Sequence, residues 1–204
     1  MTPIRRYGLE TPDVNGGKPL RADARRNRAR VLEAADDVFA AKGVSASTEE
    51  IARRAGVGVG TVFRHFPTKE ALLQAVLVER FGRLAEQARG LAGAPAPGPA
   101  LFDFLHHIVA QSATKNVFTD ALTKAGVEVE EMVAEVGREL WSALDTLLTR
   151  AQGAGAVRDD IRTGEVIAVI VGASRAAEYA GRDPDLQARA VAVIFDGLRP
   201  GPRP

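Results

Sequence analysis

Cysteine is absent from the 204 residues of this sequence. Its absence excludes disulfide bonds, thiolate catalysis and zinc sites that use cysteine ligands. Long apolar runs are missing as well, because the longest one, residues 166–177, contains Arg175 and falls short of the ~18 residues that a membrane helix needs. The basic N-terminus is not followed by the apolar segment of a signal peptide. We therefore expect a soluble, cytoplasmic protein.

Aromatic residues make up only 5% of the chain, whereas hydrophobic residues reach 46%, which is enough for a packed core. The abundant alanine, leucine, glutamate and arginine all favour helix. Apolar residues do not alternate with polar ones as they do in strands. Composition and patterning together predict an all-α fold of about nine helices.

The net charge of +1 is unevenly distributed along the chain. Residues 1–30 carry eight basic and three acidic side chains, so they have a net charge of +5 and the remainder has −4. This polarity indicates a basic N-terminal arm, although a solvated tail would have the same composition. Residues 1–20 are rich in proline and glycine and lack periodicity, which predicts that the arm is disordered.

Residues 21–68 have the pattern of three helices. After a first amphipathic helix, Ser47 and Glu50 form a capping box that opens a short second helix, which ends at Gly56. A third short helix follows the turn and stops before Pro67. Two short helices joined by a turn that contains glycine are a helix-turn-helix pattern.

Residues 69–204 are expected to form a second, larger helical domain. A long helix begins at Lys69 and ends near Leu91, and the composition of residues 92–100 is that of a linker. The remaining helices are expected at about 100–114, 116–125, 127–152, 163–181 and 184–198.

The glycines at 56, 58 and 60 have three possible explanations. A phosphate-binding Walker loop needs lysine directly after its last glycine, and a dinucleotide fingerprint needs a preceding strand and a third glycine at a different spacing. The sequence has neither, so we favour a helix that approaches DNA closely. In a helix-turn-helix the second helix enters the major groove with its N-terminal residues. Thr61 and Arg64 can then reach bases or phosphates.

Residues 21–72 resemble the DNA-binding domain of the TetR family of transcriptional regulators. The resemblance lies in "VLEAADDVFAAKG" and "IARRAGVGVGTVFRHFPTKEAL". It implies that Phe63 replaces a usual tyrosine, so only ring packing along the DNA backbone remains. Direct recognition of DNA bases would then depend on Thr61, on Arg64 and on the segment Arg21 to Arg28. The predicted DNA contacts are Ser47, Thr48, Val59, Gly60, Thr61, Phe63, Arg64, His65 and Lys69.

Each of these residues also has a purely structural explanation. Thr61 can hydrogen-bond within its own helix, and Phe63 can be half-buried by packing against its neighbours. Arg64 can be a solvated charge on the surface.

The last two expected helices, 163–181 and 184–198, are apolar on more than one face. A helix that is apolar all round must be buried all round. The resemblance implies a homodimer in which these two helices form a four-helix bundle with those of a second chain. The alternative is burial within one monomer. A dimer would place two recognition helices about one DNA turn apart on a palindrome.

The resemblance also implies a small-molecule pocket among the middle helices. The candidate residues are mostly apolar, which points to a small apolar or amphipathic effector. Residues at helical spacing can equally be ordinary core. The candidates are Phe102, Leu105, His106, Phe118, Leu122, Met132, Trp141, Leu144, Ser174 and Tyr179.

Catalysis and metal binding find little support in the sequence. Asp103, His106 and His107 have helical spacing that could hold a metal, but the chain has only three histidines. No nucleophile–base–orienter set is evident. We predict no enzyme activity, no cofactor and no metal. The predicted function is a ligand-responsive repressor of a palindromic operator. One alternative is an all-α enzyme. The other is a non-specific architectural DNA binder, and the net charge of +1 disfavours that second alternative.

Overall fold

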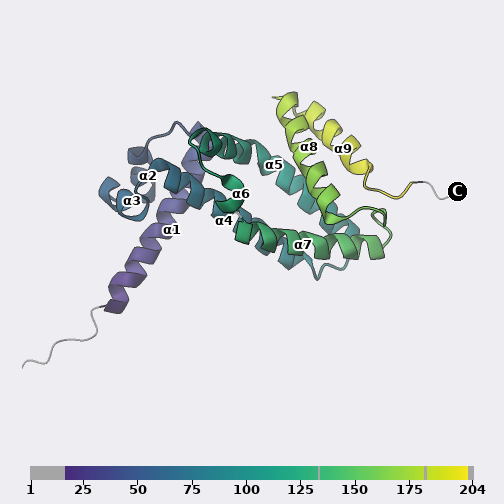
Figure 1. Cartoon of the computed structure of the whole chain (residues 1–204), viewed down its shortest axis with the longest axis horizontal. Coiled ribbons are helices and arrows are strands. Elements are labelled where there is room, and N and C mark those ends of the chain that lie inside the picture. The colour runs from purple at the N-terminus through teal and green to yellow at the C-terminus, as the bar shows by residue number, and fades with distance from the viewer. Residues whose placement is uncertain (1–16, 133, 182, 202–204) are drawn as a thin grey trace, which may run out of the picture.

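A computed structural model describes residues 17–132, 134–181 and 183–201, and the described part of the chain folds into α-helices without strands (Figure 1). The all-α prediction is confirmed. The helices are α1 (Gly17–Lys42), α2 (Thr48–Ala55), α3 (Val59–His65), α4 (Lys69–Leu91), α5 (Pro97–Lys124), α6 (Val129–Met132), α7 (Ala134–Gly153), α8 (Thr163–Ala180) and α9 (Pro184–Asp196).

Three predicted boundaries are wrong. Helix α1 begins at Gly17 rather than Arg21, since Pro19 lies in its first turn, where a helix tolerates proline. The helices expected at 100–114 and 116–125 are the single helix α5, because no glycine or proline interrupts the chain between them. The helix expected at 127–152 is instead the pair α6 and α7. Of the predicted disordered arm, residues 1–16 lie outside the described residues.

The first of two buried cores holds the helix-turn-helix. Helices α1 to α4 contribute most of it, and Val31, Phe39 and Ile51 are fully buried there. Phe118 and Leu122 from the C-terminal half of α5 also belong to this core, together with Val129 of α6. The short helices α2 and α3 are therefore held against α1 by side chains from near and far in the sequence.

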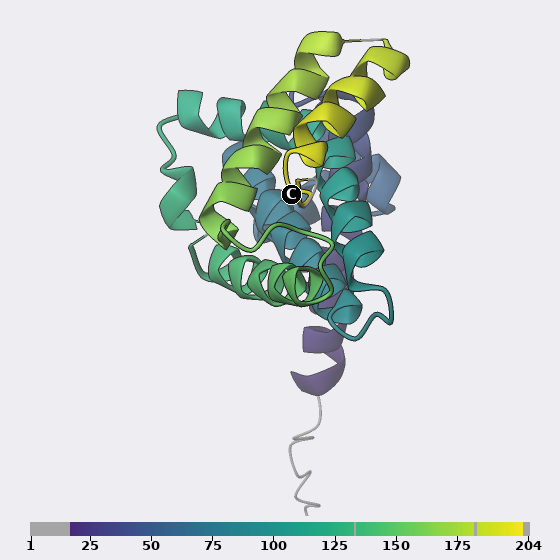
Figure 2. The ribbon, with the colours of Figure 1, turned by 90° about the vertical axis from the view of Figure 1, so that its right-hand side faces the viewer.

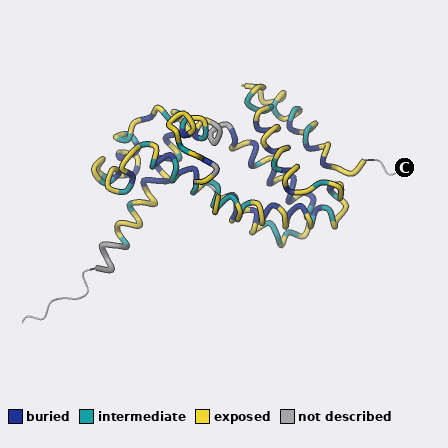
Figure 3. Tube along the Cα trace, in the orientation of Figure 1, coloured by how far each residue is buried: buried dark blue, intermediate teal, exposed yellow. Residues whose placement is uncertain are grey.

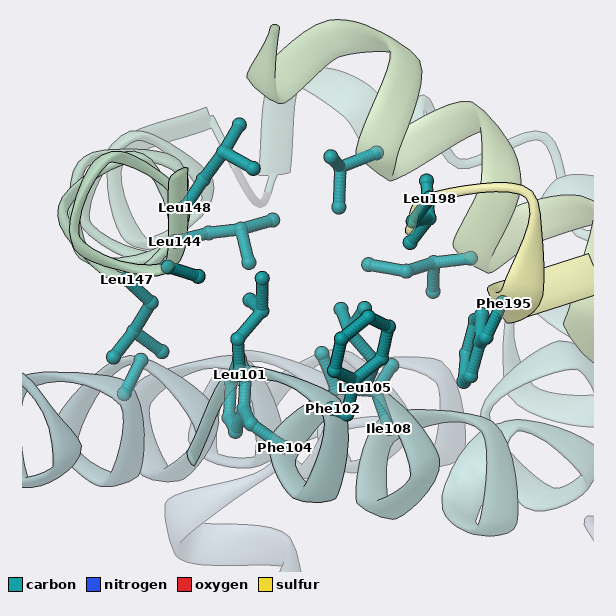
Figure 4. Packing of buried hydrophobic residues seen from close by; sticks show 14 of the residues in the cluster. Leu101, Phe102, Phe104, Leu105, Ile108, Leu144, Leu147, Leu148, Phe195 and Leu198 are labelled. Atoms are coloured by element: carbon teal, nitrogen blue, oxygen red, sulfur yellow. The ribbon is translucent and has the colours of Figure 1, made fainter. Parts of the chain in front are cut away.

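The second core lies at the other end of the molecule. The C-terminal part of α4, the N-terminal half of α5, and α7, α8 and α9 surround it. Figure 4 shows Leu101 and Leu105 of α5 facing Leu144 of α7 and Phe195 of α9. Helices α4 and α5 thus take part in both cores and join the two ends of the molecule.

Two parts of the molecule are markedly exposed. The N-terminal turns of α1 project away from the rest of the chain (Figures 1 and 2), and residues 22–30 of this helix include no buried residue (Figure 3). On α8 and α9, Val171, Tyr179 and Val193 are exposed by 51%, 92% and 73%. No helix among the described residues is long and apolar enough to span a membrane.

Candidate nucleic-acid interface

The residues at which α2 and α3 begin and end are determined by local sequence signals. Ser47 caps α2, since its side chain accepts a hydrogen bond from the Glu50 amide at 3.2 Å. The Glu50 carboxylate of the predicted capping box is engaged by Lys42 and Arg53. Helix α2 ends at Gly56, whose φ of 64° is left-handed and favours glycine. Helix α3 begins after Gly58, and its first turn is closed by the bond from the Thr61 amide to the Gly58 carbonyl at 2.8 Å.

Arg30 of α1 holds the turn between the two helices. Its guanidinium donates to the carbonyl oxygens of Ala55 and Gly56, at 2.5 and 3.3 Å. These are carbonyls at a helix end, which have no partner within the helix. A Cβ built on Gly56 would lie 2.7 Å from the Arg30 Nη2 atom, so the absence of a side chain permits this contact. Arg30 was not among the predicted site residues, and only its place in a basic segment marked it.

Gly56→Ala is expected to lower the free energy of unfolding by about 1–3 kcal/mol, because alanine at a positive φ is strained and its Cβ displaces Arg30. Urea denaturation followed by circular dichroism measures this loss. Gly90→Ala is the matched control, because Gly90 lies in α4 with open space around it and without positive φ. That variant should be neutral or slightly more stable. Equal stability of both variants would contradict the proposed role of Gly56 and Arg30 in fixing the turn between α2 and α3.

Most of the predicted DNA contacts lie at solvent-accessible positions of the helix-turn-helix, between Ser47 and Lys69. Val59 and Phe63 of α3 are exposed by 39% and 44%, and Gly60 and Arg64 are also exposed. In contrast Val62, on the opposite side of α3, is fully buried. Helix α3 therefore packs through one face and presents the other to solvent. The half-buried members of the set are Thr48, Thr61, His65 and Lys69.

Two further helix N-termini accompany α3. Ser47 is exposed before α2, and a hydroxyl that accepts one hydrogen bond can still donate another. Thr68 caps α4 by accepting from the Ala71 amide at 3.1 Å, and Lys69 follows it as the first residue of α4. Amides at helix N-termini favour anions such as phosphate. Groups that can bind phosphate therefore lie both before and after α3 in the sequence, at the N-termini of α2 and α4.

The net charge of the helix-turn-helix and the whole of α1 favours binding of a polyanion. Residues 17–69 contain eleven lysines and arginines and six aspartates and glutamates, a net charge of +5. Several carboxylates are held by arginines, as Asp37 is by Arg54 at 2.8 Å. That hydrogen bond is the main reason why the pKa of the Arg54 guanidinium is raised above its ordinary value. Arg64 on α3 is exposed to solvent.

A separate cavity of about 690 Å³ lies between α5, α8 and α9. Its wall is mostly apolar, with Val109, Val117 and Val191, and of the predicted pocket residues whose side chains the structure describes, His106 alone lines it. Arg175 of α8 donates to Glu178 at 2.8 Å and lies 3.9 Å from Asp120 of α5. The bond to Glu178 raises the pKa of Arg175. The cavity therefore combines an apolar wall with a charged cluster.

The structure does not bring the ten predicted pocket residues together. Phe118 and Leu122 lie in the first core, and Phe102, Leu105 and Leu144 lie in the second. Ser174 is buried and donates to the Ile170 carbonyl at 2.7 Å. Trp141 is 48% exposed beside a different hollow, and Tyr179 faces solvent. The side chain of Met132 lies outside the described residues.

His106 and His107 of α5 each contact residues of their own helix. His106 Nδ1 donates to the Phe102 carbonyl at 2.7 Å, and its ring lies edge-on to Phe195 at 4.9 Å. His107 contacts Gln111 at 2.6 Å. Within the described ranges, no three histidine, aspartate or glutamate side chains are grouped to hold a metal ion.

Comparison with known proteins assigns families to both ends of the chain. The family described as "Bacterial regulatory proteins, tetR family" matches residues 31–76, and that described as "Transcriptional regulator SbtR-like, C-terminal domain" matches residues 96–200. The solved TetR regulatory protein of Mycobacterium vanbaalenii is 44% identical with a TM-score of 0.72, over 89% of this chain and all of that one.

Curated relatives are matched over shorter stretches. The transcriptional regulator SrpR of Pseudomonas putida is 50% identical over 60 residues, which are 29% of this chain and 28% of SrpR. The transcriptional repressor KstR of Mycobacterium tuberculosis is 28% identical over 138 residues, or 67% of this chain and 63% of KstR. The match therefore spans less than two thirds of either relative.

Proposed function

This chain belongs to the TetR family of bacterial transcriptional regulators, and we propose that it is a ligand-responsive repressor that binds a palindromic operator as a dimer. Members of this family are DNA-binding regulators and generally not enzymes. The observation that carries the proposal is helix α3, whose face with Gly60, Phe63 and Arg64 is exposed while Val62 anchors the other face. The nine predicted contact residues would form the DNA surface.

We propose that the two ends of the chain have separate functions. Residues 21–68 would bind DNA, and residues 69–204 would regulate and dimerise, with residues 1–20 as an N-terminal arm. The exposed apolar side chains of α8 and α9, such as Val171 and Val193, support dimerisation through these two helices. Exposed apolar patches of this kind mark protein–protein contacts. We place the protein in the cytoplasm, where its DNA would be.

The cavity between α5, α8 and α9 is the proposed effector site. Its volume of about 690 Å³ lies in the usual range for small-molecule pockets. The apolar wall with a charged cluster at Arg175, Glu178 and Asp120 suits an amphipathic effector. Such an effector would release the operator only if it bound one conformation of the dimer better than the other.

Fluorescence anisotropy of labelled DNA from the flanks of the protein's own gene tests operator binding. We expect two chains per site and an affinity about 10³-fold or more above that for a random duplex at the same salt. Equal, weak binding to both duplexes would contradict operator recognition and would favour a non-specific DNA binder.

Arg64→Ala is expected to weaken operator binding about 10- to 100-fold, because one base or phosphate contact of arginine contributes about 1–3 kcal/mol. The same anisotropy titration measures it, and a set of single-base operator variants shows whether base preference is lost. Arg138→Ala removes the same charge from an exposed position of α7 and should leave binding unchanged. Wild-type affinity of Arg64→Ala would exclude Arg64 from the DNA surface.

A further inference from the structure

The cavity between α5, α8 and α9 combines a few polar side chains with a larger apolar wall. Helix α8 packs against both α5 and α9, and all three helices contribute to the lining (Figure 1). Val109 of α5 and Val191 of α9 are buried in this wall. An apolar wall binds the carbon skeleton of a ligand, and the few polar groups decide which head group fits. The polar side chains in the described lining are His106, Ser112, Asp120, Arg175, Glu178 and Gln187.

Two neutral side chains of the wall donate their hydrogens to backbone carbonyls. Ser112 Oγ donates to the Val109 carbonyl at 2.7 Å. Gln187 Nε2 donates to the carbonyls of Ala177 and Gly181, at 3.1 and 2.8 Å, and these two bonds use both hydrogens of the amide. The hydroxyl oxygen of Ser112 and the amide oxygen of Gln187 can therefore only accept a hydrogen bond from a ligand.

The third neutral side chain, His106, is also left with an acceptor. Its Nδ1 atom lies 2.7 Å from the Phe102 carbonyl, which can only accept, so the hydrogen of the neutral ring is on Nδ1. The edge-on contact with Phe195 at 4.9 Å fixes the orientation of the ring. The Nε2 atom then carries a lone pair and no hydrogen. A head group that meets these three side chains must donate hydrogen bonds.

The charged side chains of the wall favour a cation. Asp120 and Glu178 are two carboxylates beside one guanidinium, that of Arg175, so the described lining has a net charge of −1 when His106 is neutral. Arg175 donates to Glu178 at 2.8 Å but lies 3.9 Å from Asp120, which is beyond hydrogen-bond distance. The Asp120 carboxylate is thus placed to accept from a second cation.

Two groups near the cavity could instead attract an anion, and both are already occupied by carboxylates. Arg175 has further N–H groups, but an anion bound there would lie beside Asp120 and Glu178 and be repelled by them. The N-terminus of α9 is capped by the Asp183 side chain, which accepts from the Leu186 amide at 2.9 Å.

We propose that this cavity binds an amphipathic amine, an apolar compound with a protonated primary or secondary amino group, an inference that rests on the proposed effector site. The ammonium group supplies the positive charge and the hydrogen-bond donors that the acceptors of the wall require. The carbon skeleton would lie against Val109 and Val191. A carboxylic acid with the same skeleton would bring acceptors to acceptors and a negative charge to Asp120 and Glu178.

Isothermal titration calorimetry of the full-length protein with three probes tests the head group. Decylammonium, decyltrimethylammonium and undecanoate share one decyl chain and are used below their micelle concentrations. We expect decylammonium to bind about tenfold or more tightly than undecanoate, because hydrogen bonds to charged groups are the stronger ones. Decyltrimethylammonium should lie between them, since it keeps the charge but has no hydrogen to donate.

The double variant Asp120→Asn/Glu178→Gln tests whether the cavity carries this preference. Without its two carboxylates Arg175 is the remaining charge of the described lining, so the variant should bind undecanoate more tightly than decylammonium. Glu86→Gln/Asp159→Asn is the matched control, because it neutralises one glutamate and one aspartate at exposed positions. Asp159 lines the hollow beside Trp141, so an unchanged preference in the control also excludes binding there. Melting temperatures equal to that of the wild type would confirm that both variants are folded.

The outcomes separate the amine site from the regulatory function. Equal affinity of the wild type for the three probes, tighter binding of undecanoate, or no binding of any probe would overturn the proposal. An unchanged preference in the Asp120→Asn/Glu178→Gln variant would overturn it as well, because the amine would then bind elsewhere. If decylammonium binds as expected but leaves the operator titration unchanged, or no operator is found, the amine site stands and the proposed effector function fails.

Discussion

Phe118→Ala should destabilise the helix-turn-helix by about 3–5 kcal/mol, the usual cost of removing a buried phenylalanine. The ring is fully buried and meets Phe39 of α1 edge-on at 5.6 Å. The guanidinium of Arg80 in α4 lies over the Phe118 ring at 4.8 Å from its centre, and Arg80 Nε also donates to Asp36 at 2.6 Å. Alanine would leave a cavity and remove the stacking partner of an arginine that is 12% exposed. The loss therefore combines poorer packing with a less well-placed ion pair.

Urea denaturation followed by circular dichroism measures the effect of Phe118→Ala. Val117→Ala is the control, because Val117 is the neighbouring residue on α5 but is 44% exposed. Exposed substitutions usually change stability by less than about 0.5 kcal/mol. A loss below about 1 kcal/mol for Phe118→Ala would mean that the core relaxes around the missing ring. The proposed role of α5 in holding α1 and α4 would then be wrong.

Val193→Asp should convert the proposed dimer into monomers and lower operator affinity about 100-fold or more. Val193 is 73% exposed on α9, and Val171 is 51% exposed on the neighbouring helix α8. A charge buried without a partner in such an interface is strongly unfavourable. A monomer presents one recognition helix, so it loses the gain of about 10²–10⁴ that comes from joining two binding units.

Sedimentation equilibrium at micromolar concentration measures the dimer, and anisotropy measures the operator affinity of the same samples. Ala154→Asp adds the same charge at an exposed position after α7 and should remain dimeric. If Val193→Asp stays a dimer with full operator affinity, the interface lies elsewhere. If it becomes monomeric but binds the operator like the wild type, the two chains are not both needed on DNA.

The helix-turn-helix could be predicted because its signals are local. Ser47 caps α2, Gly56 ends it with a positive φ, and Pro67 directly follows Phe66, the C-cap of α3. The start of α1 was harder, since glycine and proline at positions 16–19 suggested a break. A proline in the first helical turn costs nothing, because its missing amide proton would have no partner there.

The lining of the cavity between α5, α8 and α9 could not be predicted, because helical spacing does not say which core a helix face meets. Phe118 and Leu122 lie on the same helix as Phe102 and Leu105, yet the former pair joins the first core and the latter pair the second. Tyr179 and Trp141 looked like buried aromatics by type, but Tyr179 is 92% exposed on the surface of α8. Arg175 and Asp120 meet across two helices that are far apart in the sequence, which no local pattern reveals.

The share of α5 and α6 in the first core has a consequence for the order of events during synthesis. Val31 and Phe39 are made early, but Phe118, Leu122 and Val129 leave the ribosome roughly 90 residues later. Until then the first core lacks these three side chains, and the apolar side chains that pack against them are exposed. A nascent chain that carries α1 to α4 alone therefore has its basic surface before the core beneath that surface is complete.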